Sequence, residues 1–261
     1  MNAPQDVMDD LSALGGFFTL TDATGSDAVP WHDLLADEPL ATRLDQVRRA
    51  LAEGTGQDPA DVEVRVAMSA LQVGLASRLW SVGLGAAVLH GAVPDLRSRH
   101  LLGSPGHGGV APLALAEGTP WCPVPGPREA AAELVRSVVD GSLTDLDAAC
   151  SRVGRVPPRV LLSNAASSLV GAARVLGTAR PGAAATAWAV ARLVLTAPGL
   201  AAGGATRSRA DLPSGVGGPM ERADEAFLRG GCCLFDRMPG HGLCPDCVRA
   251  PTHAHLVTPG H

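Results

Sequence analysis

Apolar and polar positions alternate with a helical period over most of the first 200 residues. From 31 to 51, leucine and valine recur at helical spacing while charged residues take the other faces. Similar patterns cover 128–139, 142–153, 158–176 and 183–196, and Ser142 and Asp145 have the spacing of a capping box. A shorter helix is predicted over 221–228. The pattern predicts a predominantly helical chain.

The most apolar segment, 62–90, is long enough for a membrane span. However, Arg65, Gln72 and Arg78 interrupt it, and Gly83 and Gly85 suggest a break in the helix. We therefore expect a buried pair of core helices and no transmembrane segment.

The helical period is lost between 92 and 121. Two short apolar runs, 95–102 and 110–115, flank a glycine-rich stretch at 103–109, which is typical of a β-hairpin. Together with the helices, this predicts an α+β fold with a small antiparallel sheet, preceded by an irregular segment up to residue 24.

Composition changes abruptly near residue 201, where glycine, serine, proline and arginine dominate. We expect a mostly helical body at 1–200, a loop or linker at 201–219, and a cysteine-rich segment at 220–261.

Charge and composition exclude one class of partner. The formal net charge is −5, the pI is about 5.9 and tyrosine is absent. A nucleic-acid-binding protein needs a basic face or aromatic platforms for bases, so we expect no nucleic-acid partner. The N-terminus shows neither a basic region nor an apolar run, which predicts a cytoplasmic protein with reduced thiols.

Four of the six cysteines lie in one 16-residue stretch, as Cys232-Cys233-x10-Cys244-x2-Cys247. Such a cluster can hold a metal ion, hold an iron–sulfur cluster or form disulfides. Disulfides rank last, because a bond between adjacent cysteines is strained and the cytosol is reducing. Structural zinc sites usually use pairs separated by two or more residues, which Cys244 and Cys247 satisfy but Cys232 and Cys233 do not. The spacing favours a two-iron cluster and leaves zinc open.

This motif, with Arg229-Gly-Gly before it and Pro239-Gly-His-Gly-Leu inside it, resembles the C-terminal signature of the FhuF-like ferric-siderophore reductases. The resemblance implies that Cys232, Cys233, Cys244 and Cys247 ligate a [2Fe-2S] cluster. It also implies an oxidoreductase that transfers one electron to iron(III) in a siderophore, of hydroxamate type, and releases iron(II). In this chain Gly230-Gly231 stands where members often carry a basic or small polar residue.

Several residues near the cysteines are candidates for tuning or docking. Arg229, Arg237 and Arg249 would raise the reduction potential of an anionic cluster, or else are surface charges paired with nearby carboxylates. His241 is a candidate donor to a cluster sulfur, or an exposed loop residue. Ser163 and Asn164, in an apolar helix, would face a substrate or bond to nearby backbone.

No flavin or nicotinamide fingerprint is present, so the electrons must come from an external donor. Two other functions remain open: a non-catalytic siderophore-related protein with a structural zinc knuckle, and an iron–sulfur electron carrier for another acceptor. Contact with the inner face of the cell membrane is also compatible with the sequence.

Overall fold

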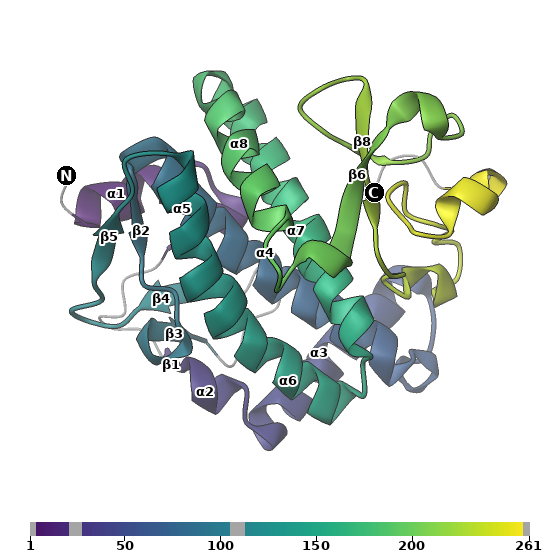
Figure 1. Cartoon of the computed structure of the whole chain (residues 1–261). Coiled ribbons are helices and arrows are strands. Elements are labelled where there is room, and N and C mark those ends of the chain that lie inside the picture. Colours follow the sequence, from purple (N-terminus) through teal and green to yellow (C-terminus); the bar gives the residue numbers. More distant parts are fainter. Residues whose placement is uncertain (1–3, 21–27, 105–112, 258–261) are drawn as a thin grey trace.

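The computed structural model describes residues 4–20, 28–104 and 113–257. Its helices surround two long central ones, and the C-terminal segment lies on one side of this helical body (Figure 1). The helices are α1 (Pro4–Ala13), α2 (Trp31–Leu34), α3 (Asp37–Thr55), α4 (Val64–His90), α5 (Pro127–Leu134), α6 (Thr144–Gly154), α7 (Pro158–Ala179) and α8 (Ala184–Leu195).

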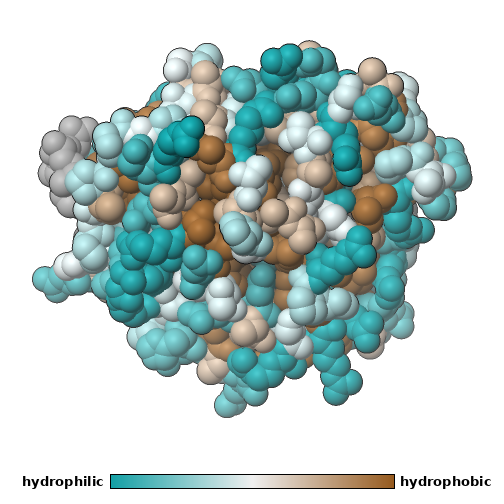
Figure 2. All heavy atoms as spheres, in the orientation of Figure 1, coloured by the Kyte–Doolittle hydropathy of each residue, from teal (hydrophilic) through white to brown (hydrophobic). Residues whose placement is uncertain are grey.

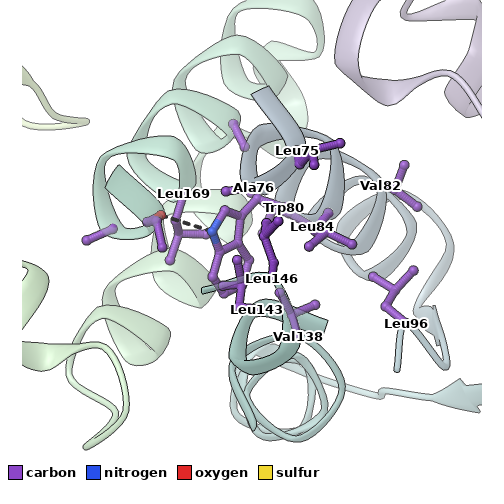
Figure 3. Packing of buried hydrophobic residues seen from close by; sticks show 14 of the residues in the cluster. Leu75, Ala76, Trp80, Val82, Leu84, Leu96, Val138, Leu143, Leu146 and Leu169 are labelled. Carbon is purple, nitrogen blue, oxygen red and sulfur yellow. Dashed lines mark hydrogen bonds between the residues drawn. The ribbon is translucent and has the colours of Figure 1, made fainter. Parts of the chain in front are cut away.

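The core is organised around α4, which packs most extensively against α7. Trp80 of α4 is fully buried, and its indole N–H donates a 2.9 Å hydrogen bond to the Ala165 carbonyl of α7. Leucine and valine side chains from several elements close around this ring (Figure 3). A buried indole satisfied in this way joins the two helices both by apolar burial and by a hydrogen bond.

The expected break in the 62–90 segment does not occur, because α4 is one continuous helix. Its glycines mark close approaches: a Cβ at Gly83 would lie 2.6 Å from Leu134, and one at Gly85 would lie 2.7 Å from Leu11. The prediction of a helix pair was therefore wrong, since these glycines make room for neighbouring side chains.

The α5 helix continues into a π-helical segment, Val135–Leu143, which is kinked at Gly141 before α6 begins. Ser142 lies buried inside this segment and makes no side-chain hydrogen bond to another described residue. The expected capping box is therefore absent, and Thr144 is the first residue of α6.

In the described part of the chain, three small antiparallel sheets accompany the helices. In the first, β3 (Leu101–Gly103) lies between β1 (Val29–Pro30) and β4 (Leu113–Leu115); in the second, β2 (Ala92–Pro94) pairs with β5 (Trp121–Pro123). The β3–β4 pairing confirms the hairpin, with shorter strands than expected, while most of its turn lies outside the described residues.

The third sheet corrects two further predictions. Here β8 (Glu225–Arg229) lies between β6 (Gly204–Ser208) and β7 (Gly218–Pro219). Residues 221–228 are thus not a helix, and the stretch expected to be a loop or linker contributes two strands. Phe227 is fully buried, so the strand is held by its partners and by apolar burial rather than by local propensity. The N-terminal segment also departs from expectation, because α1 forms there.

The helices α4 and α7 are long and apolar enough to cross a membrane. However, 67% of the apolar 18-residue stretch in each helix is buried within the protein. On the face shown in Figure 2, hydrophilic residues cover much of the surface and hydrophobic ones gather near the middle.

Candidate metal centre

The four clustered cysteines follow directly after β8 and come together in the structure. Cys233 and Cys247 are buried, whereas Cys232 and Cys244 are partly exposed. The Sγ atoms of Cys233 and Cys244 are 3.4 Å apart, and the thiol of Cys232 interacts with those of both Cys233 and Cys247. Cys244 and Cys247 also interact electrostatically, so the four thiols gather at one site.

The backbone of the cysteine loop contains several residues in the left-handed conformation. Leu234, the residue after the vicinal pair, has a left-handed conformation with φ of 72°, which is strained for a leucine. The Leu234 N–H donates to the Cys232 sulfur at 3.4 Å. Farther along, Gly240 and Gly242 have φ of 73° and 65°, so the turn around His241 uses the permissive backbone expected there.

Gly230 and Gly231 are required by a close backbone approach. A Cβ at Gly230 would lie 2.2 Å from the Ala202 carbonyl oxygen, and one at Gly231 would lie 2.9 Å from the Arg159 carbonyl oxygen. A side chain at Gly230 would push the cysteine segment away from residues 202–203, and one at Gly231 would push it away from α7. The two glycines thus have a steric reason to precede the cysteines.

Buried polar side chains on α4 and α7 form hydrogen bonds that attach the cysteine segment to the core. The Ser163 hydroxyl of α7 donates to the Gly231 carbonyl at 2.9 Å and accepts from the Gly231 N–H at 3.1 Å. The Ser69 hydroxyl of α4 donates to the Cys233 carbonyl at 2.8 Å, and Asn164 donates to Ser69 at 2.9 Å. Ser69, Ser163 and Asn164 are fully buried, so these bonds are shielded from water.

A buried ion pair completes the attachment. The Arg229 guanidinium binds Asp246 at 2.9 Å and the Asn164 side-chain oxygen at 2.9 Å, and the Ser167 hydroxyl donates to Asp246 at 2.7 Å. The side chains of Arg229 and Asp246 are only 10% and 14% exposed. Because Asp246 lies between Cys244 and Cys247, this pair ties the second half of the motif to the end of β8.

Electrostatics link Arg229 to the sulfurs. Burial lowers the pKa of Arg229, but Asp246 and the thiolates of Cys233 and Cys244 outweigh it, so the pKa is raised and the charge is retained. The pKa of the Cys244 thiol is lowered, chiefly because Cys233 donates a hydrogen bond to it, with Arg229 contributing. A retained buried cation favours negative charge on the neighbouring sulfurs of Cys233 and Cys244.

The other candidates lie on the outer side of the loop. Arg237 binds Glu63 at 2.7 Å, where α4 begins, and Arg249 binds Asp236. Arg237 thus fits the alternative of a surface charge paired with a carboxylate. Asp236 also accepts from the Cys232 thiol at 3.3 Å, so Arg249 is linked to the cysteines and its tuning role stays a prediction. The His241 ring stacks edge-to-face on Phe235 with centroids 5.5 Å apart. A role for His241 as a donor to sulfur stays a prediction.

Sequence reasoning missed Ser69 and Ser167 and favoured local bonds for Ser163 and Asn164. The structure shows side chains that reach across the fold to the cysteine segment instead. The available signal was the occurrence of several polar residues in two otherwise apolar helices.

The donor set fits a two-iron cluster. All six cysteines are free thiols in the structure. Among the described residues, no three histidine, cysteine, aspartate or glutamate side chains are arranged to hold one metal ion. Four thiols beside a buried cation suit an anionic two-iron cluster, and the contiguous Cys232–Cys233 pair differs from the separated pairs of structural zinc sites.

Comparison with known proteins identifies the same segment. The model of the FhuF 2Fe-2S C-terminal domain matches residues 229–249, which span Arg229, all four cysteines and Arg249. The match confirms the expected FhuF-like cysteine motif and points to a [2Fe-2S] cluster as cofactor. A search of characterised proteins gave no match.

Proposed function

Because the chain carries an FhuF 2Fe-2S C-terminal domain, we propose that it is a ferric-siderophore reductase. The substrate is iron(III) held by a siderophore, which takes up one electron from an external donor by way of the protein. The hard oxygen donors of a siderophore hold iron(II) less tightly than iron(III), so reduction releases the metal.

In this proposal Cys232, Cys233, Cys244 and Cys247 are the ligands of the cluster. When bound, the [2Fe-2S] cluster supplies a one-electron carrier, which matches the single electron that iron(III) needs. The observation that carries the proposal is the gathering of four thiols within the segment that matches the FhuF domain.

The rest of the chain positions this centre. Buried hydrogen bonds from α4 and α7 to Gly231 and Cys233 fix the backbone on both sides of Cys232. Arg229 keeps positive charge next to the sulfurs and favours addition of an electron. We place the reaction in the cytoplasm, where the thiols remain reduced, with peripheral contact to the inner face of the membrane as an allowed arrangement.

A single-turnover assay tests the proposal. Anaerobic protein is reduced with dithionite, freed of excess reductant and mixed with a ferric siderophore and an iron(II)-trapping dye. We expect about one trapped iron(II) per reduced cluster, with return of the oxidised spectrum. Cys232→Ser should abolish the yield, while Cys122→Ser, at an exposed cysteine outside the motif, should retain it.

Two outcomes would contradict the proposal. Reduced protein that stays reduced with every ferric siderophore would be an electron carrier for another acceptor. Unchanged iron release by the Cys232→Ser variant would show that the cysteine motif takes no part.

A further inference from the structure

A hollow of about 390 Å³ opens beside the cysteine segment, between β6 and the start of α7. Arg229 and Gly230, which precede the motif, and Val248, which follows Cys247, form one part of its lining. The hollow therefore meets the cysteine segment at both of its ends. Its volume falls within the range of small-molecule sites, about 300 to 1,000 Å³.

Arginines dominate the charge of this hollow. Arg159, Arg207 and Arg229 line it, and its lining includes no aspartate or glutamate. The charge of Arg229 is balanced by Asp246. Arg159 and Arg207 add positive charge that no carboxylate among the described residues offsets.

The two outer arginines differ in how they are held. The Arg159 Nε donates to the Gly230 carbonyl at 2.7 Å, which fixes this guanidinium against the backbone that leads into the motif. Arg207 is exposed on β6, and its side chain makes no hydrogen bond or ion pair with another described residue. Its guanidinium is thus available to a ligand at no cost in broken protein contacts.

We propose that this hollow binds the ferric chelate, and that it selects chelates with net negative charge, such as tris-catecholate or carboxylate-rich complexes. The inference rests on the proposed function and names the substrate class of the same centre. A tris-hydroxamate complex of iron(III) is neutral, so the hollow favours a different chelate class from the hydroxamates that the family resemblance implies. Guanidinium groups bind catecholate and carboxylate oxygens through charge-assisted hydrogen bonds.

A second hollow, of about 350 Å³, offers a matched control. It lies between residues 14–18 and the helices α4 and α7, has mostly apolar and serine side chains, and also reaches Arg229. Arg174 of α7 stands in its lining. Arg174→Gln removes the same charge as Arg207→Gln, but from the hollow on the other side of Arg229.

Binding is measured with gallium(III) chelates, which have the charge and shape of the ferric complexes but accept no electron from the protein. The holoprotein is titrated by calorimetry with a trianionic gallium tris-catecholate and with a neutral gallium tris-hydroxamate. We expect the trianionic chelate to bind more tightly, and added salt to weaken its binding more. Arg207→Gln should weaken trianionic binding about tenfold, leaving the neutral chelate unchanged. Arg174→Gln should change neither.

The proposal is overturned if neither chelate binds, if the neutral one binds as well or better, or if Arg174→Gln weakens binding more than Arg207→Gln. Since the titration involves no electron transfer, it separates this inference from the proposed function. Protein that binds the gallium chelate but fails to reduce the ferric one would contradict only the reductase assignment. Reduction of ferric chelates at a rate independent of Arg207 would contradict only the location of the site.

Discussion

Ser163→Ala removes the side chain that holds the backbone just before Cys232. The Ser163 hydroxyl both donates to and accepts from Gly231, and both residues are buried. Its loss leaves one N–H and one C=O without a partner in a place that water does not reach. Each orphaned group costs about 1–3 kcal/mol, so we expect a loss of roughly 2–6 kcal/mol in the free energy of unfolding.

Ser168→Ala is the matched control on the same helix. Its hydroxyl is also buried, but its bond to the Val73 carbonyl is long, at 3.5 Å. Both substitutions change helix propensity equally, so the difference between them isolates the bonds to Gly231. We expect Ser168→Ala to cost less than about 1 kcal/mol.

Two assays report the effect. Denaturant unfolding of anaerobic protein gives the change in stability, and the decay of visible absorption with an iron chelator gives the rate at which the metal site opens. If opening becomes easier by about 2 kcal/mol, Ser163→Ala should lose iron about 30-fold faster than the unmodified protein. Equal stability and equal iron loss in the two variants would refute the claim that Ser163 anchors the cysteine segment.

Three further predictions follow from the charges and the close packing. Burial raises the pKa of Asp147 to about 7, above its unfolded value, so stability falls as pH rises from about 4 to 7; Asp147→Asn should add up to about 4 kcal/mol at pH 8 and almost nothing at pH 4, measured by urea unfolding. Gly83→Ala should destabilise α4 by about 1–3 kcal/mol, because the new methyl group meets Leu134, whereas Gly74→Ala has open space and should be neutral or stabilising in thermal unfolding. Arg229→Gln should lower the reduction potential by tens of millivolts in a spectroscopic redox titration, because positive charge favours the reduced form, and Arg229→Lys should lower it less.

Helices with an apolar stripe and a clear end could be predicted from sequence. The expected 158–176 segment is α7, with proline at its first turn, and α3 ends before Gly56, whose φ is 67°. These features depend on residues close together in the chain, so local rules suffice.

Elements decided by distant partners could not be predicted. Residues 225–229 carry glutamate, alanine and leucine, which favour helix locally, but they pair with β6 about 20 residues earlier. The role of the glycines in α4 could not be predicted either, because the side chains that they make room for come from α1 and α5.

At the metal centre, the cysteine motif was readable because its chemistry lies in one short stretch. Its supports were not, since Ser163 and Gly231 are 68 residues apart and Ser69 and Cys233 are 164 apart. Neither residue type nor spacing indicates which of several serines in an apolar helix will face a loop that far along the chain. The arginines near the motif illustrate the same limit: Arg229 is buried beside the sulfurs, whereas Arg237 pairs with Glu63 at the surface.

A count of iron, inorganic sulfide and zinc in protein purified without oxygen tests most directly whether the four cysteines hold a [2Fe-2S] cluster. We expect about two irons and two sulfides per chain, with visible absorption that dithionite bleaches and that Cys233→Ser removes. Zinc without sulfide, or a full complement of iron and sulfide in the Cys233→Ser variant, would contradict it.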